Sequence, residues 1–249
     1  MGTIRPFKRT CRQFTDNSYG NEGKSSYVRH KDFANSPEQY IRAFLLIQKD
    51  LQSLFDYVEP SDQNLKCYSY RIHELLLRTC VEVEANCRAI LLENGYIKKS
   101  NLNMNDYKKI NKSHHLSSYK VKLPLWYGKK SLRKPYKKWE NGKSLPWFEA
   151  YNNTKHDRHE KFNQASFNNL IDSVCGLVVI LSSQFMQEDF MPGETYITLD
   201  GSVDGMESAI GNYFRVSYPN DWPKTEQYDF SYMDINDINF TIQKFNYNI

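Results

Sequence analysis

Residues 70–95 read YRIHELLLRTCVEVEANCRAILLENG, and this stretch decides the fold class. Mostly apolar residues recur in it at intervals of three and four, the spacing that places side chains along one face of an α-helix. They are Ile72, Leu75, Leu76, Thr79, Val83, Cys87, Ile90 and Leu91. Asn94 and Gly95 follow and favour the left-handed conformation that ends many helices. We therefore expect a long helix over residues 70–94, packed through one face against other helices.

A second helix is expected over residues 37–57. Ser36 is a typical N-cap residue, Pro37 suits the first helical turn, and Gln39 completes a capping box. Apolar residues then recur at helical spacing, and Pro60 prevents the helix from continuing.

A third helix is expected over about 150–187, beginning either at Ser144 or at Thr154, and ending before Pro192 and Gly193. Its second half carries an apolar stripe at helical spacing. The stripe consists of Leu170, Val174, Leu177, Leu181 and Phe185.

These helices predict a mainly α fold, an up-and-down bundle over residues 36–193. Alternating apolar and basic residues between 117 and 143 indicate a small antiparallel β insertion, placed at about 100–145. Residues 1–35 are expected to form an irregular arm. Residues 194–249 are expected to form an acidic extension packed on the bundle, with short strands near 196–199, 213–217 and 239–245.

The composition argues against a membrane-spanning, secreted or zinc-binding protein. The chain has 249 residues and 40% hydrophobic content, enough to bury a core, and it contains no apolar run that suits a membrane span or signal peptide. A cytoplasmic protein without membrane contact is therefore expected. The five cysteines are an odd number and form no Cys-x-x-Cys pair, which favours reduced thiols and no structural zinc. The pair His114-His115 is expected in a solvated loop, and no cofactor is expected.

Charge is unevenly distributed along the chain. Residues 108–143 hold twelve Lys or Arg and one acid, Glu140, whereas residues 194–249 hold nine acids and three cations. This asymmetry predicts that the insertion contacts a polyanion, RNA being the expected partner, although a solvated basic face remains the alternative. The candidate RNA-binding residues are Lys120, Lys122, Lys129, Lys130, Arg133, Lys134, Lys137 and Lys138. Aromatic residues lie among them and offer stacking surfaces or a small local core. These are Tyr119, Trp126, Tyr127, Tyr136 and Trp139.

The start of the third helix carries the candidate site. When its apolar stripe is continued toward the N-terminus, the same face holds Asn163, His159, His156 and Asn152. Polar groups on a packing face cost free energy unless they are paired, so a functional cleft is one explanation. A satisfied polar network or a solvent-exposed helix end is the other. Lys155 and Arg158 flank this face and place two cations beside an imidazole.

The string Tyr151-Asn152-Asn153-Thr154-Lys155-His156-Asp157-Arg158, together with the earlier long helix, resembles the HEPN superfamily (higher eukaryotes and prokaryotes nucleotide-binding). Nuclease members carry an Arg, often followed by Asn, and then a His four to six residues later. Asn152 and His156 match the Asn and His, and Lys155 fits the Asn-x-x-Lys-His form. Tyr151 occupies the Arg position, and Arg158 is the substitute we consider. The resemblance implies that Glu82 and Asn86 orient the site, with His159 one turn beyond.

The resemblance implies a homodimeric, metal-independent endoribonuclease of the kind found in phage defence and toxin–antitoxin systems. In such a reaction His156 moves the proton of a ribose 2′-hydroxyl, while Arg158 and Lys155 stabilise charge on the phosphate. Tyr151 favours a second hypothesis, an inactive module of the same fold that binds nucleic acid, nucleotide or a protein partner. A third hypothesis is an antitoxin or scaffold whose acidic residues 194–249 cover a basic partner.

Overall fold

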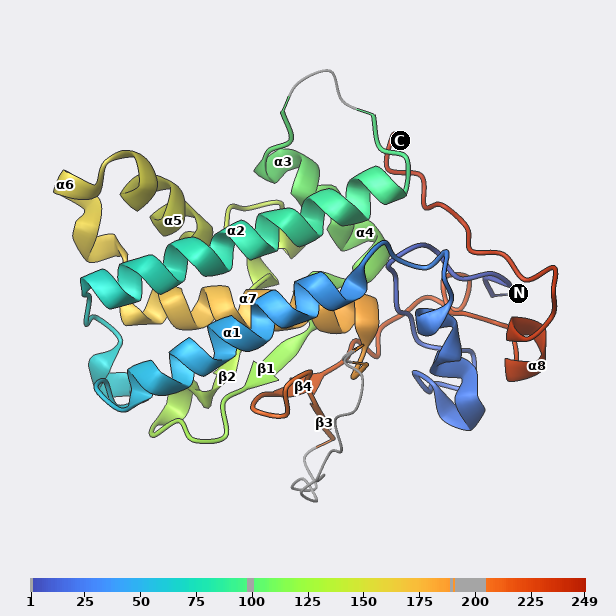
Figure 1. Cartoon of the computed structure of the whole chain (residues 1–249), viewed down its shortest axis with the longest axis horizontal. Helices are drawn as coiled ribbons and strands as arrows, with labels where there is room; N and C mark the ends of the chain where they lie inside the picture. The colour runs from blue at the N-terminus through green and yellow to red at the C-terminus, as the bar shows by residue number, and fades with distance from the viewer. Residues whose placement is uncertain (1, 98–100, 189, 191–204) are drawn as a thin grey trace.

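The computed structural model describes residues 2–97, 101–188, 190 and 205–249. Within these ranges the fold is mainly helical, as expected, with a small four-stranded antiparallel sheet (Figure 1). The helices are α1 (Pro37–Phe55), α2 (Tyr70–Glu93), α3 (Met104–Tyr107), α4 (Asn111–His114), α5 (Pro146–His156), α6 (Arg158–Lys161), α7 (Phe167–Phe185) and α8 (Tyr232–Ile235). The strands are β1 (Lys120–Lys122), β2 (Leu132–Arg133), β3 (Glu207–Ser208) and β4 (Arg215–Ser217).

Helices α1 and α2 confirm the first two expected helices. The side chain of Ser69 caps α2 by accepting a hydrogen bond of 3.2 Å from the Ile72 amide, and Gly95 takes the expected positive φ of 80°. At the start of α1, Pro37 lies in the first turn, but Ser36 adopts φ 45° and its side chain makes no capping hydrogen bond. The helix therefore begins where expected without the predicted capping box.

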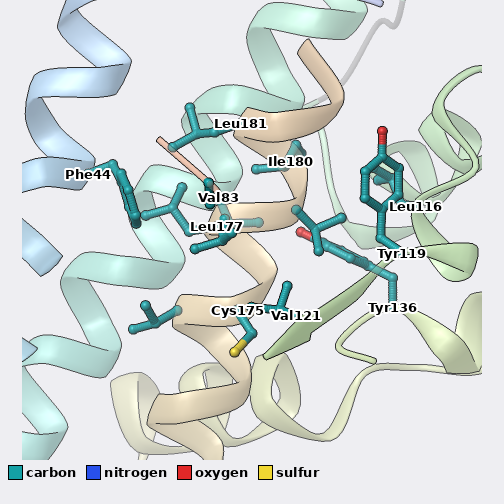
Figure 2. Packing of buried hydrophobic residues seen from close by; sticks show 14 of the residues in the cluster. Phe44, Val83, Leu116, Tyr119, Val121, Tyr136, Cys175, Leu177, Ile180 and Leu181 are labelled. Atoms are coloured by element: carbon teal, nitrogen blue, oxygen red, sulfur yellow. The ribbon is translucent and has the colours of Figure 1, made fainter. Parts of the chain in front are cut away.

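Helix α7 lies at the centre of the core and packs against α2, α5 and α1. Its stripe residues are all fully or almost fully buried, Leu177 among them at 0% exposure. Figure 2 shows Leu177 and Leu181 on the side of α7 that faces Val83 of α2 and Phe44 of α1. Val121 and Tyr136 of the insertion cover another side of the same helix. Because both sides are covered, nearly every residue of α7 from Leu170 onward is buried.

The sheet joins two segments that the sequence analysis treated separately. Its order is β2-β1-β4-β3, so the insertion supplies two strands and the C-terminal extension supplies the other two. Val121 pairs with both Arg133 of β2 and Val216 of β4. The strand expected near 213–217 is thus confirmed in part, whereas the one near 196–199, like Pro192 and Gly193, lies outside the described residues.

The N-terminal segment 2–35 contains a 3-10 helix over Asn21–Arg29 and is packed into the core, so the expectation of an irregular arm holds only in part. Cys11, Phe14, Tyr27 and Phe33 are buried, and Thr3 and Phe14 each bridge to Tyr228 of the C-terminal extension. Much of the extension therefore packs against the N-terminal segment, at the end of the molecule where α8 and the N-terminus lie (Figure 1).

His114 corrects the expectation of a solvated histidine pair. Its side chain is completely buried, and Nε2 lies 2.8 Å from the backbone carbonyl of Arg9. Burial lowers the pKa of His114 to about 3, because the charged imidazolium is disfavoured inside the protein. This histidine is part of the core.

Candidate nucleic-acid interface

The third expected helix is interrupted near the candidate site. Helix α5 ends at His156, and Asp157 follows it with φ −139° and ψ 63°. The Asp157 side chain caps α6 by accepting a hydrogen bond of 3.4 Å from the Glu160 amide. Ser166 caps α7 in the same way, accepting from the Asn169 amide at 3.4 Å. These short side chains offer the backbone local hydrogen bonds that compete with a continuous helix. The expectation of one uninterrupted helix over 150–187 was therefore wrong.

This break changes the positions of the candidate residues. Because the helical repeat does not continue across Asp157, the apolar face of α7 does not lead back to His159 and His156. Every residue from Lys155 to Lys161 is exposed, and Asn152 is half-buried. Within the described residues the His156 imidazole has no hydrogen-bond partner, and the imidazole of His159 has a polar contact with its neighbour Glu160, at 3.0 Å. The exposed helix end, one of the two explanations considered above, is what the structure contains.

Tyr151 occupies a buried position between α5 and α2. It is 1% exposed, and its hydroxyl donates a hydrogen bond of 2.9 Å to Glu84 while accepting one of 3.1 Å from Lys155. Burial raises the pKa of Tyr151, and the hydrogen bond to Glu84 raises it further. Tyr151 and Lys155 are thus drawn into a polar link that fastens α5 to α2. The sequence analysis did not identify Glu84 as a partner of Tyr151, because its position on α2 was the only indication of this contact.

Glu82 and Asn86 lie on other faces of α2 and do not join this link. Asn86 is fully buried, donates to the Glu82 carbonyl at 2.8 Å and accepts from Gln184 of α7 at 3.0 Å. Burial raises the pKa of the half-buried Glu82 carboxyl, and Arg78 opposes this effect. Asn86 therefore connects α2 to α7.

Exposed aromatic residues lie beside the helix break. Tyr70 and Tyr68 are 67% and 50% exposed, and their rings lie 4.7 and 5.5 Å from the ring of Phe162. The guanidinium of Arg158 lies over Tyr70, 5.7 Å from the ring centre. We call Tyr68, Tyr70, Arg158 and Phe162 the Tyr70 surface. It combines a cation with exposed aromatic side chains, two features common in surfaces that bind unpaired nucleotides.

His73 lies next to this surface, and the sequence analysis did not identify it as a candidate site residue. The side chain is 6% exposed, its ring centre is 5.7 Å from that of Phe162, and Nε2 has no hydrogen-bond partner among the described residues. Burial lowers the pKa of His73 and Arg158 lowers it further, while a backbone hydrogen bond to Thr154 acts in the opposite direction. A signal was present in the sequence, because His73 follows Tyr70 by three residues on α2.

The basic insertion is only partly a free surface. Exposed cations remain, namely Lys120, Lys129, Lys130, Lys134, Lys137 and Lys138, while Lys122 is half-buried. Arg133, in contrast, is 6% exposed and donates to Asp172 at 3.0 Å and to Asn168 at 2.8 Å. Its guanidinium also lies over Trp126, so Arg133 fastens the insertion to α7 and is not part of the exposed basic surface.

Most aromatic residues of the insertion form a local core. Tyr119, Trp126, Tyr136 and Trp139 are buried, and only Tyr127 of the five is exposed, at 73%. Asp62 anchors the loop between β1 and β2, because its carboxylate accepts from Trp126 Nε1 at 2.8 Å and from the amides of Lys129 and Lys130. The segment between α1 and α2 that carries Asp62 also leads into Tyr68 and Tyr70. The basic loop and the Tyr70 surface thus occupy the same end of the molecule (Figure 1).

A cleft of about 460 Å³ between the end of α1 and the start of α2 lies near the Tyr70 surface. Tyr57 lines it and is 87% exposed, while Arg78 in its wall is paired with Asp50 at 2.6 Å.

Among the described residues, no three His, Cys, Asp or Glu side chains come together as potential ligands of one metal ion. No helix in these ranges has the length and apolar character needed to cross a membrane. No family model matches the chain, and neither a curated protein nor a solved structure shows significant similarity to it.

Proposed function

We propose that this chain is a HEPN-like module that binds single-stranded RNA across the Tyr70 surface. The observation that carries the proposal is the exposed Tyr70 ring with Arg158 above it and Phe162 beside it. Unpaired bases stack on such rings whatever their sequence, and a guanidinium next to the ring contacts the phosphate or stacks on the base.

The basic loop extends this surface for a longer strand. Lys129 and Lys130 are exposed, and Asp62 holds their backbone amides beside the segment that leads to Tyr70. In this proposal, phosphates further along a strand that stacks on Tyr70 contact these cations. The affinity is then expected to fall steeply as salt concentration rises, because each neutralised phosphate releases counterions.

Two variants test the proposal. Tyr70→Ala and Arg158→Ala should each weaken binding of a fluorescent single-stranded RNA, the Tyr70 change by about tenfold, as expected for one lost stacking contact. Both side chains are exposed, so the melting temperature should hardly change.

Matched controls lie at the opposite end of the molecule. Tyr232 is 46% exposed on α8, and Arg29 is exposed at the end of the segment Asn21–Arg29, which packs against α8. Tyr232→Ala and Arg29→Ala remove the same groups and should leave RNA affinity unchanged. Equal affinity of the Tyr70→Ala protein and the Tyr232→Ala protein would refute the Tyr70 surface as the binding site.

Endoribonuclease activity is a second candidate function, favoured by the exposure of His156 between Lys155 and Arg158 in sequence. Binding is the better supported of the two, because Tyr151 stands where nuclease members have Arg and is tied to Glu84 and Lys155. Incubation of bound RNA with EDTA, followed by mapping of RNA ends, separates the two functions. Intact RNA identifies a binding module, and new ends carrying cyclic phosphate identify a metal-independent nuclease.

A further inference from the structure

A cavity of about 620 Å³ lies between the N-terminal segment, α4 and the C-terminal segment. Arg12, Lys112 and His115 are among the residues that line it, as is the acidic residue Glu226. Phe7 and Phe245 form an apolar part of the wall, with ring centres 5.3 Å apart. The cavity is remote from the Tyr70 surface, because the N-terminal segment and α6 lie toward opposite ends of the molecule (Figure 1).

Arg12 is the unusual residue of this cavity. It is 2% exposed, and Nη1 donates to the backbone carbonyl of Glu226 at 3.0 Å. Nε and Nη2 are buried without a hydrogen-bond acceptor among the described residues. Aromatic rings surround the guanidinium, those of Phe7 and Trp222 at 4.9 and 5.1 Å from its carbon. These rings attract a cation but provide no negative charge.

The other buried arginines of the described chain show what Arg12 lacks. Arg9 is paired with Glu93 at 2.7 Å, and Arg133 is paired with Asp172 at 3.0 Å. A buried guanidinium without a counter-charge is unfavourable, because desolvation is not offset by Coulomb attraction. Since Arg12 lines a cavity, the missing anion can come from outside the chain.

We propose that this cavity binds a small molecule through its phosphate group. A phosphate monoester carries enough negative charge to compensate both Arg12 and Lys112, and guanidinium groups match phosphate oxygens in geometry. The Phe7 and Phe245 rings would contact the remainder of the ligand. Such a site is independent of the RNA surface proposed above.

His115 is held in a fixed orientation at the cavity. Its ring stacks on Trp222 at 3.9 Å, Nε2 lies 3.3 Å from Glu226, and Nδ1 lies 3.7 Å from Asp221. The imidazole thus lines the cavity while its Nε2 lies close to the Glu226 carboxylate.

Calorimetric titration of the full chain with inorganic phosphate and with phenyl phosphate tests the proposal, and acetate serves as the non-phosphate anion. Both phosphates should bind, phenyl phosphate more tightly because of the two phenylalanine rings, and both should raise the melting temperature. Lys112 is exposed, so Lys112→Ala should fold normally and weaken phosphate binding by about tenfold, as expected for one charge-assisted hydrogen bond. Lys224→Ala, which removes an exposed cation that does not line the cavity, is the matched control and should bind as the parent does.

Glu226→Gln distinguishes a ligand site from an internal ion pair. If an external phosphate compensates Arg12, removal of the opposing carboxylate should tighten phosphate binding several-fold. Absence of phosphate binding by the parent protein, or equal affinity of the Lys112→Ala and Lys224→Ala proteins, would overturn the proposal. So would a Glu226→Gln protein with unchanged phosphate affinity and a lower melting temperature, because Glu226 would then be the counter-ion of Arg12. Arg12→Gln is the less useful variant, since a change at this buried position is expected to disturb folding.

Discussion

The hydroxyl of Tyr151 donates a hydrogen bond of 2.9 Å to the carboxylate of Glu84, and through this contact α5 is fastened to α2. Lys155 donates to the same hydroxyl at 3.1 Å, so three side chains form one polar link. Tyr151, which the resemblance aligns with the arginine of the nuclease motif, therefore has a packing role in this chain.

Tyr151→Phe should destabilise the fold without affecting RNA binding. The substitution keeps the buried ring but removes both hydrogen bonds, which should lower the free energy of unfolding by about 1–3 kcal/mol, since the acceptor is charged. Urea unfolding of the variant and the parent gives this difference. An unchanged midpoint of urea unfolding would mean that these hydrogen bonds do not stabilise the fold. A loss of RNA affinity would instead indicate that Tyr151 takes part in RNA binding.

Arg133→Met should destabilise the chain far more than Lys134→Ala. The first variant leaves the partly buried Asp172 without its cation, which typically costs about 3–5 kcal/mol, whereas exposed Lys134 has no such partner and its loss should cost less than about 0.5 kcal/mol. Urea unfolding again supplies the comparison. If the double variant Arg133→Met, Asp172→Asn is no more stable than Arg133→Met alone, the uncompensated carboxylate is not the cause.

How far the sequence predicted the fold depended on the length of each periodic pattern. Helices α1 and α2 carry an apolar stripe from end to end, and α7 carries one along its buried length, so all three could be located. The break at Asp157 was missed because a stripe indicates which face is buried and not whether the helix continues. Asp157 and Ser166 are both good N-cap residues, and they were the available signal.

The candidate site was harder to predict, because its arrangement depends on tertiary contacts. Arg133 looks like any other cation of the insertion, and only its contact with Asp172, 39 residues away, removes it from the surface. In the same way, the sequence around each residue does not indicate that Tyr70 is exposed and Tyr136 is buried. The sequence analysis placed its candidate site in the segment 151–158, whereas Tyr70 and His73, which lie beside Phe162, belong to the separate helix α2.

The loop between β1 and β2 should loosen as pH falls. The hydrogen bond from Trp126 is the main cause that lowers the pKa of Asp62, and the amides of Lys129 and Lys130 lower it further. A carboxyl whose pKa is lower in the folded state stabilises the fold above its unfolded pKa of about 3.9, and this contribution is lost as pH falls through the folded pKa. The loop contacts should therefore be intact at pH 5 and lost only below the usual aspartate range.

NMR of the Trp126 indole proton follows this transition directly. Its chemical shift should change with an apparent pKa below about 3.9 in the parent protein, and the transition should disappear in Asp62→Asn. A transition at or above the ordinary aspartate value would show that the three hydrogen bonds do not stabilise the charged carboxylate.

The last prediction separates binding from cleavage at His156. This imidazole is exposed and unpartnered within the described residues, so His156→Ala should leave the melting temperature almost unchanged. If the chain is a nuclease, the same variant should lose about a hundredfold or more in cleavage rate, as expected when a general acid or base is removed, and RNA affinity should fall much less. His159→Ala is the matched control, because His159 is also exposed and its imidazole makes a polar contact with Glu160. Cleavage that persists in the His156→Ala protein would exclude His156 as the catalytic group. Should the parent protein leave RNA intact, Tyr70→Ala and not His156→Ala becomes the variant that weakens RNA binding, by about tenfold, as expected for one lost stacking contact in a binding module.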